Sequence, residues 1–203
     1  MIRPVLRLAL LGVFAVALSG CISLLPKSKP ATLYRFGPEP AAVATTAAQP
    51  GAVAVFRTKG KFQEEATDDR ILTIDGGKAA YIAQSRWVAP AEVLFDEALG
   101  QAFDASPIRL IARGQQGRSA YALRIDVRNF EARYDAGSNA APLVVVRVHA
   151  ALTRADQTSV GEQDFEARVP AAQNRVGAIV AAFNKAVSDV LGKIVGWTET
   201  SAT

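Results

Sequence analysis

The sequence predicts an α+β fold, in which a mainly antiparallel sheet carries two amphipathic helices packed on one face. Three observations lead to this class. Several consecutive segments alternate apolar and polar residues and are joined by short turns, which is typical of antiparallel strands. One amphipathic helix interrupts the strands, and a longer one follows the last of them.

The first half of the chain contains four strand candidates and one helix. Alternating or β-branched segments predict strands over residues 33–36, 52–57, 71–74 and 79–84. Asp75-Gly76-Gly77 joins the last two, because Asp-Gly readily adopts the positive φ of a type I′ hairpin turn. Pro90 then begins a helix at the position where its missing N–H costs nothing. The apolar face of this helix consists of Leu94, Ala98, Leu99, Ala102 and Phe103.

The second half is richer in strands and ends in a long helix. Further strands are predicted over residues 108–112, 121–134, 143–152 and 165–169. Within the second of these, the apolar positions change phase after Val127. We expect a β-bulge near Arg128-Asn129, and a break into two strands is the alternative. The apolar stripe from Val176 to Ile194 predicts a helix that closes at Gly196-Trp197.

Length, composition and charge are those of a globular domain. The chain has 203 residues, half of them hydrophobic, which is sufficient for one domain with its own core. Its formal net charge is +4, and removal of Arg3 and Arg7 would leave about +2. No segment clusters lysine and arginine with aromatic residues, so the sequence gives no indication of nucleic-acid binding.

The N-terminus has the layout of a secretory signal peptide. Arg3 and Arg7 supply positive charge before an apolar run, which is shorter than the roughly 20 residues needed to span a bilayer. The residues that follow resemble the lipobox of bacterial lipoproteins, in which a cysteine thiol receives a diacylglyceryl group. They are Leu18, Ser19, Gly20 and Cys21. A soluble secreted protein with an incidental Cys21, or an uncleaved amphipathic anchor, is the competing interpretation.

These features divide the chain into four parts. We expect a signal peptide at residues 1–20, a lipidated cysteine and tether at 21–31, one α+β domain at 32–197 and a polar tail at 198–203. Cys21 is the only cysteine, so lipidation, palmitate included, would use it and leave no intrachain disulfide. In the tether, Lys27 and Lys29 either lie near anionic lipid headgroups or keep the segment soluble.

The sequence contains no convincing catalytic or metal site. His149 is the only histidine and lies on a predicted strand, with no second histidine or cysteine to share a metal. A hydrolase that uses His149 as a general base is the weaker hypothesis, because no nucleophile motif accompanies it. We therefore predict a protein without enzymatic activity, metal or cofactor. Arg86 and Trp87 are candidate partner contacts, since Arg and Trp dominate interface hot spots, and a role of Trp87 in core contacts is the alternative.

The order of these features resembles the ABC-type transport auxiliary lipoprotein family. The resemblance is carried by the lipobox, a short proline-containing tether, the strand Leu33-Tyr34-Arg35-Phe36 and the hairpin that contains Arg70-Ile71, Gly76-Gly77-Lys78 and Tyr81. It continues through Trp87-Val88-Ala89-Pro90 to the amphipathic C-terminal helix. The first strand departs mildly from the Tyr-Thr/x-Leu pattern that is usual in the family.

The resemblance implies a lipid-anchored protein that faces the periplasm and performs no catalysis. Its implied partners are the membrane, an MCE-domain protein and an ABC permease and ATPase, in systems that move phospholipid or other hydrophobic solutes across the Gram-negative envelope. Ile22 follows the cysteine, and the absence of Asp there implies the outer membrane by the known sorting rule. Homo-oligomerisation is left open. A structural lipoprotein of outer-membrane assembly or of the cell wall is the alternative, because fold alone does not decide function.

Overall fold

The computed structural model describes residues 30–37 and 52–202 of the chain. Two compact units are distinguished, Met1–Pro30 and Ala31–Thr203, and the described strands and helices belong to the second. The hydrophobic core is formed by residues between Phe36 and Ala202. The second unit therefore carries its own core and can fold without the residues that precede it. No helix in the described part of the chain is long and apolar enough to cross a membrane.

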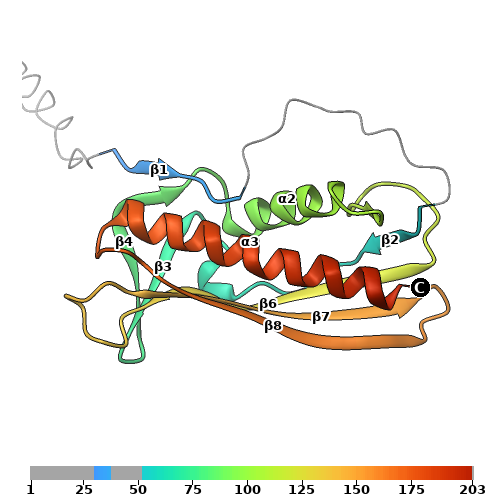
Figure 1. The fold of residues 1–203 in the computed structure, drawn as a ribbon. Helices are drawn as coiled ribbons and strands as arrows, with labels where there is room; N and C mark the ends of the chain where they lie inside the picture. The colour runs from blue at the N-terminus through green and yellow to red at the C-terminus, as the bar shows by residue number, and fades with distance from the viewer. Residues whose placement is uncertain (1–29, 38–51, 203) are drawn as a thin grey trace, which may run out of the picture. The chain divides into compact units, whose positions relative to one another are not determined.

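The second unit is an α+β domain with an eight-stranded sheet (Figure 1). Its strands are β1 (Thr32–Tyr34), β2 (Ala54–Arg57), β3 (Arg70–Asp75), β4 (Lys78–Trp87), β5 (Arg109–Ile111), β6 (Tyr121–Arg133), β7 (Leu143–Arg154) and β8 (Ser159–Pro170). Its helices are the short 3₁₀ helix η1 (Glu64–Ala66) and the α-helices α2 (Ala91–Asp104) and α3 (Val176–Ser201).

The sheet is mixed, so the prediction of a mainly antiparallel sheet was wrong. The pairs β3–β4, β6–β7 and β7–β8 are antiparallel, as expected for strands that follow one another along the chain. The pairs β1–β4, β2–β5, β2–β6 and β3–β6 are parallel. Parallel neighbours need long crossover connections, and local sequence patterns do not reveal which distant strands such connections bring together.

Strand β6 is the centre of the sheet. One of its edges pairs with β7 along its whole length, and the other is shared by β2, by an isolated bridge from Phe62 to Val127, and by β3. Between β2 and Phe62 the chain passes so close to β6 that a Cβ on Gly60 would lie 1.8 Å from the carbonyl oxygen of Ile125. Glycine is therefore required at position 60.

Two local predictions from the sequence are confirmed. The register of β6 and β7 shifts between Val127 and Asn129, which is the expected bulge rather than a break between two strands. The bulge keeps Phe130 in the core after the change of phase. In the β3–β4 hairpin, Gly76 and Gly77 have φ of +52° and +85°, as the turn sequence required.

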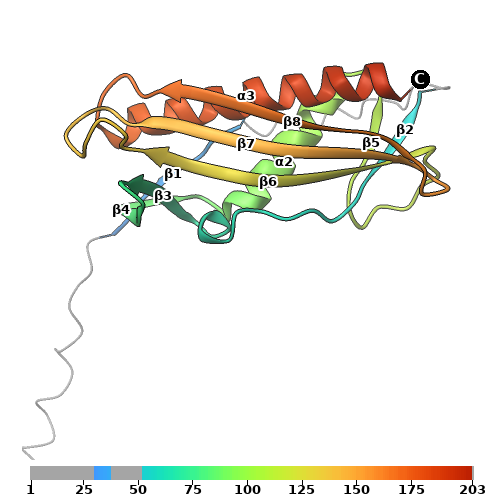
Figure 2. The ribbon, with the colours of Figure 1, turned by 90° about the horizontal axis from the view of Figure 1, so that it is seen from below.

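Both α-helices lie on the same side of the β6–β7–β8 part of the sheet (Figure 1), and Figure 2 shows them behind it. Helix α3 packs on β7 and β8, and α2 packs against α3 and β5. Helix α3 continues to Ser201, so the predicted end at Gly196-Trp197 was too early. Thr198 is fully buried and donates a hydrogen bond to the carbonyl oxygen of Ile194 at 2.7 Å, and residues 198–201 therefore belong to the helix rather than to a polar tail.

Aromatic rings join the helices to the sheet. The ring of Phe130 on β6 contacts five other aromatic rings at centroid distances from 4.9 to 6.5 Å. They belong to Phe36, Phe62, Trp87, Phe95 and Phe183. These residues come from five separate segments of the chain, so one ring holds together elements that are distant in sequence.

Substitution of Phe130 by alanine is expected to lower the free energy of unfolding by about 3–5 kcal/mol, because it leaves a cavity where five rings meet. The control is Phe165→Ala, which removes a ring of the same size whose one described aromatic contact is the edge-to-face contact with Trp197. Urea unfolding of residues 31–203 measures both variants. Equal losses for the two variants would contradict the central position given to Phe130.

Candidate functional site

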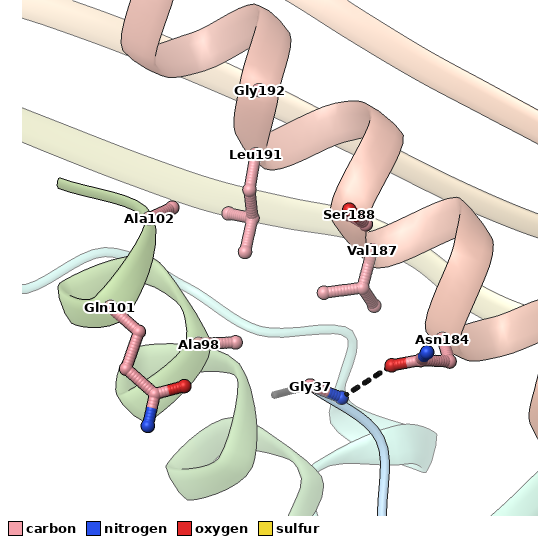
Figure 3. A pocket seen from close by; sticks show the side chains of 9 residues that line it. All are labelled: Gly37, Ala98, Gln101, Ala102, Asn184, Val187, Ser188, Leu191 and Gly192. Atoms are coloured by element: carbon pink, nitrogen blue, oxygen red, sulfur yellow. Dashed lines mark hydrogen bonds between the residues drawn. The ribbon is translucent and has the colours of Figure 1, made fainter. Parts of the chain in front are cut away.

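A groove lies between α2 and α3. Its volume is about 340 Å³, at the lower end of the range for small-molecule sites. It is lined by Gly37, Ala98, Gln101, Ala102, Asn184, Val187, Ser188, Leu191 and Gly192. Figure 3 shows Val187 and Leu191 pointing from α3 toward α2, where Ala98 and Ala102 face them.

Small side chains keep this groove open. Ala98 and Ala102 lie one turn apart on α2 and are too short to fill the space opposite Val187 and Leu191. Gly192 is in the middle of α3, where glycine costs about 1 kcal/mol relative to alanine. A Cβ at this position would meet nothing within 4 Å. Neither a close contact nor an unusual φ explains this glycine, and its effect is to leave the groove unfilled.

One end of the groove is closed by the segment after β1. Gly37 has a φ of +83°, and a Cβ there would lie 3.1 Å from the Cβ of Ala98. The backbone N–H of Gly37 donates a hydrogen bond to Oδ1 of Asn184 at 2.9 Å, drawn as the dashed line in Figure 3. This bond ties the segment after β1 to α3 and fixes the end of the groove.

The chemistry of the groove is neutral. None of its lining residues is charged. Oε1 of Gln101 is buried and has no hydrogen-bond partner within the described structure, and Figure 3 shows it turned toward Ala98 and Gly37. A buried acceptor without a hydrogen bond destabilises the protein, and a donor on a bound molecule would remove this cost. The groove is therefore suited to a neutral, largely apolar group that carries a hydrogen-bond donor.

The residues predicted from the sequence lie elsewhere. Leu18, Ser19, Gly20 and Cys21 are outside the described residues. Trp87 is only 2% exposed, with its ring against Phe36 and Phe183, so its side chain is part of the core and offers no surface to a partner. Arg86 is half-exposed and is paired with Asp69 at 2.7 Å. A partner contact at Arg86 stays a prediction.

The environment of His149 gives no support to hydrolysis. Its Nδ1 lies 3.0 Å from Oδ1 of Asp164, and its Nε2 lies 3.4 Å from Oε2 of Glu162. Hydrogen bonding to His149 is the main reason that the pKa of Asp164 lies below its ordinary value. The polar groups that the described structure places against the ring nitrogens are these two carboxylates, and neither is the hydroxyl or thiol nucleophile that a histidine general base would activate. Within residues 30–37 and 52–202, no group of three His, Cys, Asp or Glu is arranged to hold a metal ion.

The groove between α2 and α3 is not among the features predicted from the sequence. The signal that could have found it is the small residues on the apolar stripes of the two helices, since Ala98 and Ala102 were assigned to the core face and Gly192 was not singled out. Small residues at such positions are compatible with close helix contact as well as with a hollow. The three-dimensional arrangement of the helices decides between the two.

Together, these observations describe an α+β domain with a neutral groove between its two α-helices. Its sequence belongs to a known family, the ABC-type transport auxiliary lipoprotein components, whose family model matches residues 34–195. Membership identifies the protein as an auxiliary lipoprotein component of a transport system, anchored in the cell envelope. No curated protein matches the sequence.

Solved structures agree with this assignment. The domain is similar to the crystal structure of a Xanthomonas campestris protein assigned to the family DUF330, with 27% sequence identity and a TM-score of 0.67. That match covers 84% of this chain and 96% of the other. A second crystal structure, of a protein described only as uncharacterized, has 11% identity and a TM-score of 0.63 over 83% of this chain and 99% of that one. At this identity the second structure supports the fold alone.

Proposed function

We propose that the protein is a non-enzymatic lipoprotein of an MCE-associated ABC transport system, which moves phospholipid or another hydrophobic solute across the Gram-negative envelope. The observation that carries this proposal is the family match over residues 34–195. The neutral groove between α2 and α3 supports binding rather than catalysis. The domain would face the periplasm from the outer membrane.

Lipidation of Cys21 would determine where the domain acts. Each buried methylene group contributes about 0.8 kcal/mol to membrane binding, so one acyl chain binds marginally and two or more bind stably. A diacylglyceryl cysteine would therefore hold the protein in one leaflet. Residues 22–31 would serve as the tether, and the domain from residue 32 would meet its partners close to that membrane.

The groove is the place where we expect the domain to hold an apolar group of the solute. Val187 and Leu191 form its floor and are almost completely buried, while Asn184 and Ser188 are exposed at its mouth. Transfer of an aliphatic group from water into this space is favourable by about 25 cal/mol per Å² of apolar surface buried. A donor on the same molecule would satisfy Oε1 of Gln101.

Replacement of Cys21 by serine is expected to abolish acylation, because a hydroxyl does not replace the thiol in the lipobox reaction. Metabolic labelling with an alkynyl palmitate analogue and the intact mass measure acylation, and Ser23→Ala is the control outside the lipobox. The serine variant should stay at precursor mass without label. Label that persists in Cys21→Ser would contradict lipidation at this residue.

Cross-linking in membranes and purification of the lipidated protein is expected to recover an MCE-domain protein together with the permease. The Cys21→Ser variant should recover less of both, because it is not held in the leaflet where they meet. Recovery of only peptidoglycan or of a β-barrel assembly complex would instead favour the structural alternative and overturn the transport role.

Filling the groove is expected to weaken binding without loss of stability. Gly192→Leu places a side chain in open space at the groove, and Gly177→Leu makes the same change on α3 outside the groove, where a Cβ also meets nothing within 4 Å. Binding is measured by the fluorescence of an environment-sensitive fatty-alcohol probe, which is neutral and carries a hydroxyl donor, on addition to residues 31–203. Gly192→Leu should bind several-fold more weakly than Gly177→Leu, and equal binding would argue against the groove as the binding place.

A further inference from the structure

Exposed aliphatic side chains gather where the chain enters the domain. Four large apolar residues of the described chain are exposed, and three of them are Leu33 at 59%, Val88 at 47% and Val93 at 45%. Single exposed apolar residues are normal on protein surfaces, whereas a group of them marks an interaction site. We name Leu33, Val88 and Val93 the tether-side patch, since Leu33 lies two residues after the start of the unit at Ala31.

The register of β1 and β4 brings the first two of these residues together. Leu33 is paired with Arg86 on β4, and the N–H of Val88 donates a hydrogen bond to the carbonyl oxygen of Tyr34 at 2.8 Å. Trp87 lies between Arg86 and Val88 and is buried in the core. Because side chains alternate along extended chain, Arg86 and Val88 point outward on the side of Leu33.

Val93 extends the patch onto α2. Val93 and Glu97 lie one turn apart on the same side of this helix. Glu97 accepts a hydrogen bond at 2.6 Å from the guanidinium of Arg35, which lies two residues after Leu33. The Arg35–Glu97 pair thus links the outer side of α2 to the chain segment that contains Leu33.

The charges beside the patch are balanced. Arg35 is paired with Glu97 and Arg86 with Asp69, and all four side chains are partly exposed. Aliphatic residues among paired, partly exposed arginines suit the boundary between lipid headgroups and acyl chains, where an arginine keeps its head in water and its stem against apolar surface. An acidic partner surface would require unpaired cations instead.

We infer that the tether-side patch rests on the membrane leaflet that holds the acyl chains of Cys21; this inference depends on the lipid anchor of the proposed function. The ten residue-to-residue steps from Cys21 to Ala31 can span at most about 33–36 Å, so the leaflet is always within reach. Because the tether already holds the domain at the membrane, the effective concentration of the leaflet around the patch is high. Weak apolar contacts are then sufficient to keep the patch on the leaflet. Lys27 and Lys29 favour a tether that stays close to anionic headgroups.

The single native cysteine makes a direct test practical. If lipid occupies Cys21, the thiol introduced by Val88→Cys is the only free one and can be labelled with an NBD fluorophore. The lipidated full chain is reconstituted into vesicles of phosphatidylethanolamine and phosphatidylglycerol that contain a nitroxide-labelled lipid. The control label is on Gln116→Cys, an exposed position in the loop after β5. Figure 2 shows β1 and β5 at opposite ends of the domain.

Quenching of the label by nitroxide lipid is expected to be several-fold stronger at position 88 than at position 116. Leu33→Asp combined with Val93→Asp should reduce quenching at position 88 to the control value while the protein stays on the vesicles. Equal quenching at the two positions, or none at 88, overturns the inference. The inference is also overturned if the label at position 88 becomes shielded from water as the protein concentration rises but is not quenched by nitroxide lipid. That result would indicate a protein partner or a second copy at the patch.

The anchor and the patch fail in different ways. Protein that is absent from the vesicles overturns lipidation at Cys21 and, with it, the inference. Protein that is present on the vesicles but unquenched at position 88 overturns the inference alone and leaves the anchor of the proposed function intact.

Discussion

The position of one aromatic ring is the constraint on which the domain depends. Phe130 lies in the core because a bulge between Val127 and Asn129 returns the second half of β6 to the inward phase. Its ring then contacts rings from β4, α2, α3 and the segments that follow β1 and precede η1. Both helices that line the groove are therefore positioned by the same contact. Without the bulge, the ring would face solvent and these elements would lose their common point of attachment.

Local features of the fold could be predicted from the sequence, whereas the order of the strands could not. The turn at Gly76-Gly77, the bulge after Val127 and the beginning of α2 at Ala91, one residue after the predicted Pro90, are each encoded within a few residues. The parallel pairs join strands that are distant in sequence. Which of these strands become neighbours is determined by the packing of the complete hydrophobic core. The end of α3 was also misjudged, because the hydroxyl of Thr198 bonds within the helix and leaves this polar residue compatible with burial.

The candidate site shows the same contrast between features encoded within a few residues and features that depend on distant segments. The lipobox is a contiguous signal, so residues 18–21 could be proposed without any structure. Trp87 and Arg86 are neighbours in sequence, yet they point to opposite sides, so one belongs to the core and the other to the surface. The groove and the tether-side patch each combine residues from distant segments. Their existence depends on register and helix placement, which no short window of sequence contains.

Strand β8 acquires a further significance if many copies share one membrane surface. It is an outer strand of twelve residues, and such an edge is a template on which another chain can pair. Lys193 on α3 donates a hydrogen bond to the backbone carbonyl oxygen of Glu166 at 2.9 Å, and charged side chains alternate along the strand at Glu162, Asp164, Glu166 and Arg168. The β8 strand of a second copy would have to displace the lysine and bring its own acidic residues close to Asp164 and Glu166. Copies of the protein that are anchored at high density in one membrane are thus protected from pairing through the exposed edge of β8.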